Sequence, residues 1–246
     1  TIDYGPYGWL EGYEPGWTPN TTDASMRRYC FGRQPRIAMW NLFCFANAIY
    51  PLVGRTEPMK EVLAEVEKTL ERSSLEMVGD KLGLTMGADD EALWSQLESV
   101  LQLSETDMTL FFRGLSSVPT EASAPDEALL APILRAAYVP DAWEREARAS
   151  MLAWLRAYGE RARSEDRSAA QRKSAMDRVN PKYVLRNYLA QVAIDAAEQG
   201  DPGELLTVLD VMRRPYSEQP QYSSYAAKRP EWARNRPGCS TLSYSS

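Results

Sequence analysis

The residue of greatest chemical interest is an aspartate near the start of the sequence. Asp3 follows a short strand-like lead and is separated by one aromatic residue from Gly5. Proteins usually hold Mg²⁺ with one or two carboxylates together with the phosphates of a substrate. A glycine next to such a carboxylate lets the backbone approach the ligand closely. The spacing therefore indicates a carboxylate that holds the metal ion of a nucleotide.

The same three residues also fit a simpler structure. An Asp-x-Gly sequence often makes a turn that has no chemical role, and short motifs recur by chance. Protein kinases, however, place a metal-binding aspartate at a strand end in this way. Under that hypothesis most of the catalytic machinery precedes Asp3, and we expect it to lie outside this sequence.

The overall composition excludes several other kinds of chemistry. The 246 residues contain no histidine, so imidazole bases, histidine metal ligands and Ser-His triads are excluded within the sequence. The three cysteines, Cys30, Cys44 and Cys239, lack the spacing of a zinc site and are expected to be free thiols in a reducing compartment. A net charge of −6 argues against a nucleic-acid partner. The most apolar stretch, 37–53, is too short and too polar for a membrane span.

The elements that must position these residues are predicted to be mainly α-helical. Residues 1–34, rich in Gly, Pro and aromatic residues, are expected to form an ordered loop that carries the Asp-aromatic-Gly motif. Residues 35–214 show apolar side chains at helical spacing. Helices are predicted over 35–49, 57–81, 89–103, 104–115, 126–137, 140–163, 181–199 and 203–213. Residues 215–246 are expected to form an irregular tail.

Two further groups of side chains offer binding chemistry. Four arginines near the end of the predicted loop could grip phosphates in the fork geometry of the guanidinium group: Arg27, Arg28, Arg33 and Arg36. Each arginine taken singly also fits a solvated surface. Aromatic residues alternate with Gly and Pro earlier in the loop, at Tyr7, Trp9, Tyr13 and Trp17. We expect them to pack the loop against itself rather than to stack on bases.

Several longer strings share one pattern. They are TIDYGPYGWL at 1–10, TPNTTD at 18–23, RYCF at 28–31, QP at 34–35, WNL at 40–42, NPKYVLRNYL at 180–189, PY at 215–216 and PEWA at 230–233. Together they resemble the selenoprotein O (SelO) family of kinase-like protein adenylyltransferases over nearly the whole sequence. The resemblance implies the C-lobe and helical C-terminal extension of a protein-kinase-like fold, with the N-terminal lobe absent from this sequence.

The resemblance also implies an activity and a site. SelO proteins transfer AMP from ATP to Ser, Thr and Tyr hydroxyls of protein substrates, and Asp3 stands where the family aspartate binds Mg²⁺ or Mn²⁺ and contacts ATP. Residues 11–34 would correspond to the activation segment. The glycine-rich loop, the ion-paired lysine and the catalytic Asp-Asn pair of the family all precede the Asp3 motif. No catalytic base is therefore expected in this chain, which should be inactive without the N-terminal region as its partner.

Some positions depart from the family pattern. Tyr244 stands where many members carry cysteine or selenocysteine, and Thr18-Pro19-Asn20 stands where some members place a cysteine. Arg33 replaces an asparagine that often precedes the Gln-Pro pair. The alternatives are a non-catalytic helical interaction module and an ordinary phosphotransferase of kinase fold. A mitochondrial location is expected for a eukaryotic source and a cytoplasmic one for a bacterial source.

Overall fold

The computed structural model describes residues 8–18 and 27–239 of the chain. Asp3 and Gly5 lie outside the described residues, as do the 19–26 stretch and Tyr244. The described part is mainly helical, as the sequence predicts. Its only β pairing is two isolated antiparallel bridges, Gly12 with Asp107 and Thr106 with Ala137.

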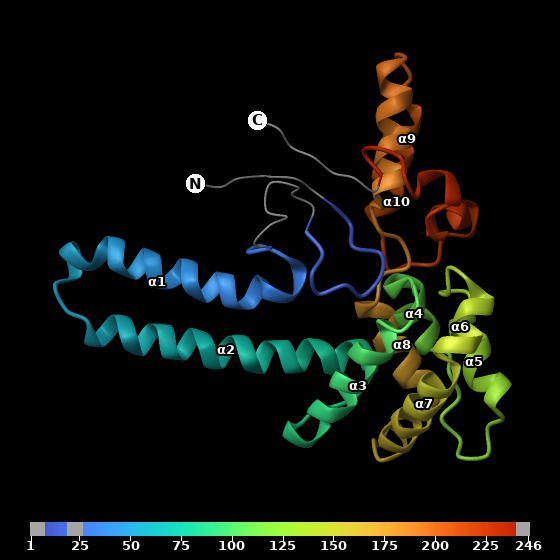
Figure 1. Cartoon of the computed structure of the whole chain (residues 1–246), viewed down its shortest axis with the longest axis horizontal. Coiled ribbons are helices and arrows are strands. Elements are labelled where there is room, and N and C mark those ends of the chain that lie inside the picture. Colours follow the sequence, from blue (N-terminus) through green and yellow to red (C-terminus); the bar gives the residue numbers. More distant parts are fainter. Residues whose placement is uncertain (1–7, 19–26, 240–246) are drawn as a thin grey trace.

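Two long helices form an arm that extends from the rest of the molecule (Figure 1). They are α1 (Gln34–Val53) and α2 (Glu57–Leu82), joined by a short turn at Gly54, whose φ of 65° suits a residue without a side chain. No residue of α1 is buried, although the helix is strongly apolar. Only the C-terminal end of α2 enters the core, through Val78, Gly79 and Leu82.

Six helices pack around that end of α2 and form the main core. They are α3 (Glu91–Leu101), α4 (Met108–Leu115), α5 (Asp126–Leu134), α6 (Pro140–Glu146), α7 (Arg148–Arg163) and α8 (Ala169–Val179). Helix α4 runs through the middle, and seven of its eight residues are buried. Trp154 and Tyr158 of α7 stack with ring centroids 5.2 Å apart, and the Tyr158 hydroxyl donates to the Leu82 carbonyl at 2.7 Å. This bond ties α7 to the end of α2.

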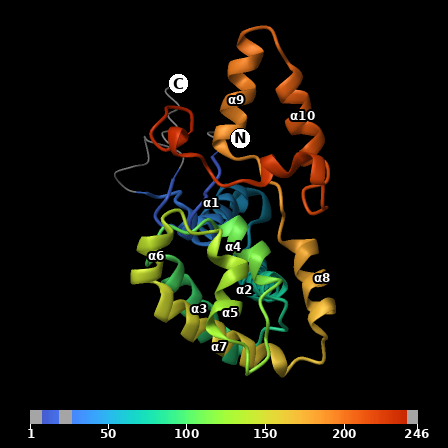
Figure 2. The same cartoon turned by 90° about the vertical axis from the view of Figure 1, so that its right-hand side faces the viewer.

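A smaller unit lies on the other side of α4. It contains the antiparallel pair α9 (Asn187–Glu198) and α10 (Gly203–Met212), seen side by side in Figure 2, and the short 3₁₀ turns η4 (Pro220–Ala226) and η5 (Glu231–Ala233). Its own core consists of Tyr188, Leu189, Ala233 and Cys239, with Tyr225 packed against them. The chain after α10 is thus folded back onto α9.

The structure corrects two of the predicted helices and adds one that was not predicted. The predicted helix over 140–163 is interrupted at Ala147, where φ is −111°, and forms α6 and α7 instead. The predicted helix over 181–199 begins only at Asn187, because Arg186 and the residues before it are not helical. Helix α8 was not predicted. Its capping box, in which Ser168 and Gln171 exchange hydrogen bonds, was visible in the sequence as a helix start.

The structure confirms part of what the sequence predicts for the cysteines and for the apolar helices. Cys30, Cys44 and Cys239 are all free thiols. Cys239 is buried against α9 rather than carried on a flexible tail. Within the residues that the structure describes, no helix combines the length and the apolar character that a membrane span requires.

Candidate functional site

The segment that leaves the Asp3 motif is held by a pair of hydrogen bonds with α9. The Trp9 backbone N–H donates to Asn187 Oδ1 at 2.7 Å, and Asn187 Nδ2 donates back to the Trp9 carbonyl at 3.2 Å. Asn187 is the first residue of α9, so the amide stands at a fixed point of a regular helix. An amide side chain that satisfies both backbone groups of one residue acts as a strand partner for that residue. The structure therefore fixes the chain six residues after Asp3.

Two residues further along the loop, Glu11 and Gly12 pair with the start of α4. The Met108 N–H donates to the Glu11 carbonyl at 2.7 Å, and Gly12 bridges with Asp107. The loop thus lies between α4 and α9, and both helices contribute their first residues to it. Helix starts are rigid points from which to hold a loop, because their backbone groups are already oriented by the helix.

A largely buried group of polar and charged side chains joins this loop to the helices. We call it the anchor cluster, and it consists of Glu11, Asp107, Tyr138, Arg186 and Arg229. Arg186 forms a two-pronged pair with Asp107, with Nη1 at 2.6 Å from Oδ2 and Nη2 at 3.1 Å from Oδ1. Arg186 Nη1 lies 3.4 Å from Glu11, and Arg229 lies 3.1 Å from the other oxygen of Glu11. The Tyr138 hydroxyl lies 3.0 Å from Glu11 and 3.2 Å from Asp107.

The electrostatics of the anchor cluster are those of a structural network. Burial raises the pKa of Glu11, and the nearby Arg186 and Arg229 offset only part of that rise. Burial also acts to lower the pKa of Arg186, but Asp107 and Glu11 outweigh it and raise the pKa overall. Two carboxylates are thus matched by two guanidinium groups. Each acid of the cluster is committed to an arginine, so the cluster positions the loop rather than transferring protons.

The cluster and its surroundings bring together strings that are far apart in the sequence. Glu11 follows the opening string, and Arg186 and Asn187 belong to the string at 180–189. The Pro215 carbonyl accepts hydrogen bonds from the Lys182 N–H at 2.8 Å and from the Tyr183 N–H at 3.0 Å. Trp232 of the string at 230–233 packs edge to face on Tyr188, with ring centroids 6.2 Å apart. Four separate strings therefore form one region around the loop.

Sequence reasoning did not identify the anchor cluster. The sequence assigns Glu11 no role, and Asp107 falls within the predicted helix over 104–115. The Asp107 side chain does cap α4, since Oδ1 accepts from the Leu110 N–H at 2.9 Å. Its partner Arg186 is 79 residues away. The only signal in the sequence was that both strings belong to one family pattern.

The structure brings together three of the four predicted phosphate-binding arginines. Arg28, Arg33 and Arg36 line a hollow of about 320 Å³ at the start of α1, together with Ile37 and Trp40. The Arg28 guanidinium lies over the Trp40 ring, 3.9 Å from its centroid. Arg27 instead donates to the Gly16 carbonyl at 3.3 Å. The three guanidinium groups give the hollow a positive charge, and a role in phosphate binding stays a prediction.

The described part of the aromatic loop packs partly on itself, as expected, while Trp9 contacts α9 and Tyr7 lies outside the described residues. Tyr13 meets Phe31 edge to face, with ring centroids 6.1 Å apart. The Phe31 N–H donates to the Trp17 carbonyl at 2.9 Å, and the Gly32 N–H donates to the Pro15 carbonyl at 2.8 Å. These contacts fold the start of the loop against the segment that leads into α1.

The described residues form no complete metal-binding site. Over 8–18 and 27–239, no three carboxylates or cysteines come together in a way that could hold one. A single aspartate with nucleotide phosphates and water is the usual environment of Mg²⁺. Asp3 is a residue of the right type for that environment, and its role stays a prediction.

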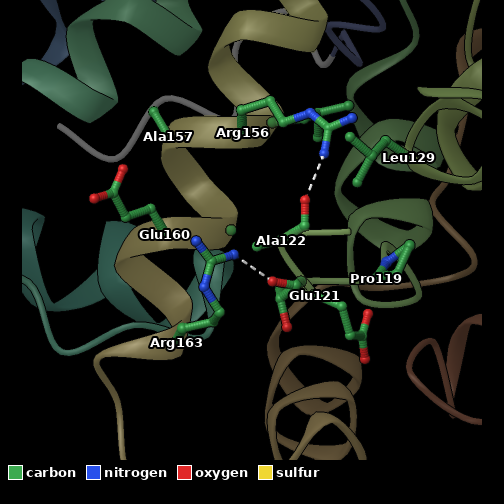
Figure 3. Close-up of a pocket in the computed structure, with 11 residues that line it drawn as sticks. Pro119, Glu121, Ala122, Leu129, Arg156, Ala157, Glu160 and Arg163 are labelled. Atoms are coloured by element: carbon green, nitrogen blue, oxygen red, sulfur yellow. Dashed lines mark hydrogen bonds between the residues drawn. The ribbon is translucent and has the colours of Figure 1, made fainter. Parts of the chain in front are cut away.

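A hollow of about 290 Å³ beside α7 does not have the features of a functional site. Figure 3 shows Arg156 and Arg163 of α7 pointing to the loop that precedes α5. Arg156 donates to the Ala122 carbonyl at 3.3 Å, and Arg163 donates to the Thr120 carbonyl. Both arginines thus hold the loop in place, and Arg156 also pairs with Asp126 at 2.7 Å. The groups do not converge on a common point.

Comparison with known proteins gives one consistent result. The sequence profile of the family described as "Protein adenylyltransferase SelO" matches residues 1–213. The chain is 51% identical to a protein nucleotidyltransferase YdiU of Azoarcus sp. (strain BH72) and 48% identical to one of Rhodopirellula baltica. Both matches cover 100% of this chain but only 46% and 47% of the relatives. The chain therefore spans just under half the length of these relatives.

Proposed function

Because this chain belongs to the SelO family of protein adenylyltransferases, we propose that it is the C-terminal part of an enzyme that transfers AMP from ATP to hydroxyl groups of proteins. In this reaction the oxygen of a Ser, Thr or Tyr hydroxyl bonds to the α-phosphorus of ATP. The bond from that phosphorus to the bridging oxygen breaks, and pyrophosphate leaves. The hydroxyl proton passes to a base in the region that the relatives have and this chain does not span.

In this proposal Asp3 is the residue that links the chain to the nucleotide. Its carboxylate would hold Mg²⁺ or Mn²⁺ on the phosphates, where the charge of the metal favours displacement at phosphorus. The observation that carries the proposal is the pair of hydrogen bonds between Trp9 and Asn187. Because the chain is fixed six residues after Asp3, the helical body would restrict where the carboxylate can lie. Restricting a ligand in this way lowers the entropy cost of assembling the reaction site.

The missing part of the relatives would also explain the exposed arm. Helix α1 is apolar on more than one side, and a helix of that kind is normally surrounded by protein. Phe43, Phe45 and Leu52 are 56%, 61% and 88% exposed. We propose that the other half of the protein packs on α1, so that the arm belongs to the core of the complete enzyme. The apolar face and the partial coverage of the relatives support the same assembly.

The test is AMP transfer by the protein extended to the full length of its relatives. With ATP labelled on the α-phosphate, we expect label to enter a protein substrate in the presence of Mg²⁺ or Mn²⁺. Asp3→Ala should abolish the transfer, whereas the exposed Asp166→Ala should leave it unchanged. The 246-residue chain by itself should transfer no label.

Three outcomes would contradict these proposals separately. If the extended protein is folded and binds ATP but transfers no label, the adenylyltransferase proposal fails and a non-catalytic helical module gains support. If the 246-residue chain alone transfers label and Asp3→Ala stops it, the proposal that this chain needs the other half fails. Transfer that survives Asp3→Ala in the extended protein would overturn the role of Asp3.

A further inference from the structure

A further cavity lies between the N-terminal loop and the core. Its volume is about 270 Å³, and it is bounded by the loop, the end of α2 and the starts of α3 and α4. The lining is mainly aromatic or sulfur-containing and includes Trp9, Phe31, Met77, Trp94, Met108 and Phe112. A cavity of about 150 Å³ is enough to hold benzene. This one therefore has room for a ring and a short side chain.

Lys81 places a positive charge at the wall of this apolar cavity. Its ammonium lies 4.9 Å from the centroid of the Phe112 ring, and its one hydrogen bond in the described structure is to Asn180 Oδ1 at 3.5 Å. An ammonium group has three N–H donors, so most of its capacity is unused. Burial also lowers the pKa of Lys81, in keeping with a charge that lacks compensation.

Of the other polar groups that line the cavity, Trp9 also has an N–H donor without an acceptor in the described part of the chain. The indole Nε1–H of Trp9 is buried and has no hydrogen-bond partner among the described residues. The Tyr13 hydroxyl is already used, since it donates to Glu98. Among the described residues, no aspartate or glutamate lines the cavity. Buried donors without acceptors are costly, so the cavity favours a ligand that brings acceptors and a negative charge.

We propose that this cavity binds a small amphipathic carboxylate, with an aromatic or short aliphatic body against Trp94, Met108 and Phe112 and the carboxylate on Lys81. The apolar walls supply binding through burial of the body, and the ammonium selects the head group. The inference does not depend on nucleotide chemistry at Asp3. Because Trp9 and Phe31 form one wall, an occupied cavity would also hold the loop more firmly against the helices.

Three probes with nearly the same body and different heads test the proposal in the whole chain. They are 3-phenylpropionate, 3-phenylpropanol and 3-phenylpropylamine, which carry a carboxylate, a hydroxyl and an ammonium group. Methyl signals of ¹³C-labelled methionine report the binding. Met77 and Met108 line the cavity, whereas Met39 and Met59 lie on the arm and serve as off-site reporters. We expect saturable shifts of Met77 and Met108 with 3-phenylpropionate, binding of the alcohol about tenfold weaker and no saturable binding of the amine.

Substitution of Lys81 separates head-group recognition from apolar binding. Lys81→Met keeps the length of the side chain and removes the charge, so 3-phenylpropionate should bind no more tightly than the alcohol. Retained binding of the alcohol would show that the variant is folded. The exposed Lys68→Met on the same helix should keep the preference for the carboxylate.

Several results would overturn the proposal. Equal binding of all three probes would show that Lys81 does not select the head group. Equal shifts at Met39, Met59, Met77 and Met108 would show partition onto the apolar arm instead of a site. No shift of Met77 and Met108 at any probe concentration, or an unchanged preference in Lys81→Met, would also reject it.

Discussion

Arg186 and Asp107 form a two-pronged ion pair in which both side chains are almost completely enclosed. Arg186 Nη1 lies 2.6 Å from Asp107 Oδ2, and Nη2 lies 3.1 Å from Oδ1. Their side chains are 1% and 0% exposed. Asp107 also caps α4, and Arg186 immediately precedes α9. The pair therefore joins the main core to the smaller unit at the point where the N-terminal loop passes between them.

Arg186→Met should destabilise the protein strongly. The substitution leaves Asp107 and Glu11 buried without their shared partner, and removing one member of a buried pair typically costs about 3–5 kcal/mol. The loss should appear as a lower urea midpoint in equilibrium unfolding.

Arg172→Met is the matched control, because Arg172 is a buried arginine that forms no ion pair with the described residues. It donates Nη2–H to the Val118 carbonyl at 2.9 Å, while Nε and Nη1 have no partner. Replacing it with an apolar side chain of similar length should change the free energy of unfolding by less than about 1 kcal/mol, or increase it. Equal losses for the two variants would contradict the structural role of the Asp107–Arg186 pair.

Asn187→Ala should reduce AMP transfer by the extended protein more than it reduces stability. The loss of both hydrogen bonds to Trp9 frees the chain that follows Asp3, and a small displacement of a reacting group can cost about 10²-fold in rate. The free energy of unfolding should fall by about 1–3 kcal/mol, because the Trp9 N–H loses its partner. The turnover number at saturating ATP and a urea titration measure the two effects.

The exposed Asn235→Ala should change neither quantity. A full rate of transfer in Asn187→Ala would show that the bonds to Trp9 do not position the site. Faster hydrogen exchange at 9–12 in Asn187→Ala would confirm directly that the loop has been released.

Replacing Phe45 and Leu52 by serine should have opposite effects in the two forms of the protein. In the 246-residue chain the double variant should be more monomeric, because these side chains are exposed on α1 and favour self-association. In the extended protein the same change should lower stability, since burying large apolar side chains contributes several kcal/mol in total. Light scattering after size-exclusion chromatography measures the first effect and thermal unfolding the second.

Leu103→Ser serves as a control for this prediction, because Leu103 is half-exposed but lies outside the arm. It should not raise the monomer fraction to the same degree. An extended protein that tolerates the α1 substitutions without loss of stability would show that the arm is not covered.

The free energy of unfolding should fall in acid, because protonation of Asp90 breaks its ion pair with Arg161. The Arg161 Nε–H donates to Asp90 at 2.7 Å, and this hydrogen bond is the main reason that the pKa of Asp90 lies below its ordinary value of 3.8. Between these two pKa values the unfolded chain binds more protons than the folded chain. The contribution of Asp90 is therefore complete above about pH 4 and is lost as the pH falls through the folded-state pKa.

Urea midpoints at pH 6, 4 and 3 check this prediction. Arg161→Met should lower stability at pH 6 and make the further loss between pH 4 and pH 3 smaller than in the parent chain. Arg156→Met, which breaks the more exposed pair with Asp126, should leave most of that loss in place. An acid loss in Arg161→Met as large as that of the parent chain would contradict the assignment.

Much of the helical architecture could be predicted because helices depend on neighbouring residues. The start of α2 at Glu57 and the presence of helices α3, α4 and α10 follow from apolar spacing and capping residues, although α4 begins at Met108 and not at the predicted residue 104. The errors arose where tertiary contacts override local preference. Residues 182 and 183 are held by the Pro215 carbonyl, so that stretch stays extended although its sequence fits a helix.

The sequence by itself determined the mainly helical fold and membership of the SelO family. Both depend only on the order of residues, through the helical spacing of apolar side chains and the family strings. It also identified Asp3 as the residue to test. Only the tertiary structure decided that Asn187 holds Trp9 across 178 residues and that Arg186 pairs with Asp107 and Glu11. A charged side chain fits the same sequence pattern whether it is solvated or buried. Its partner is chosen by the packing of distant elements, which remove it from water and leave one opposite charge within reach.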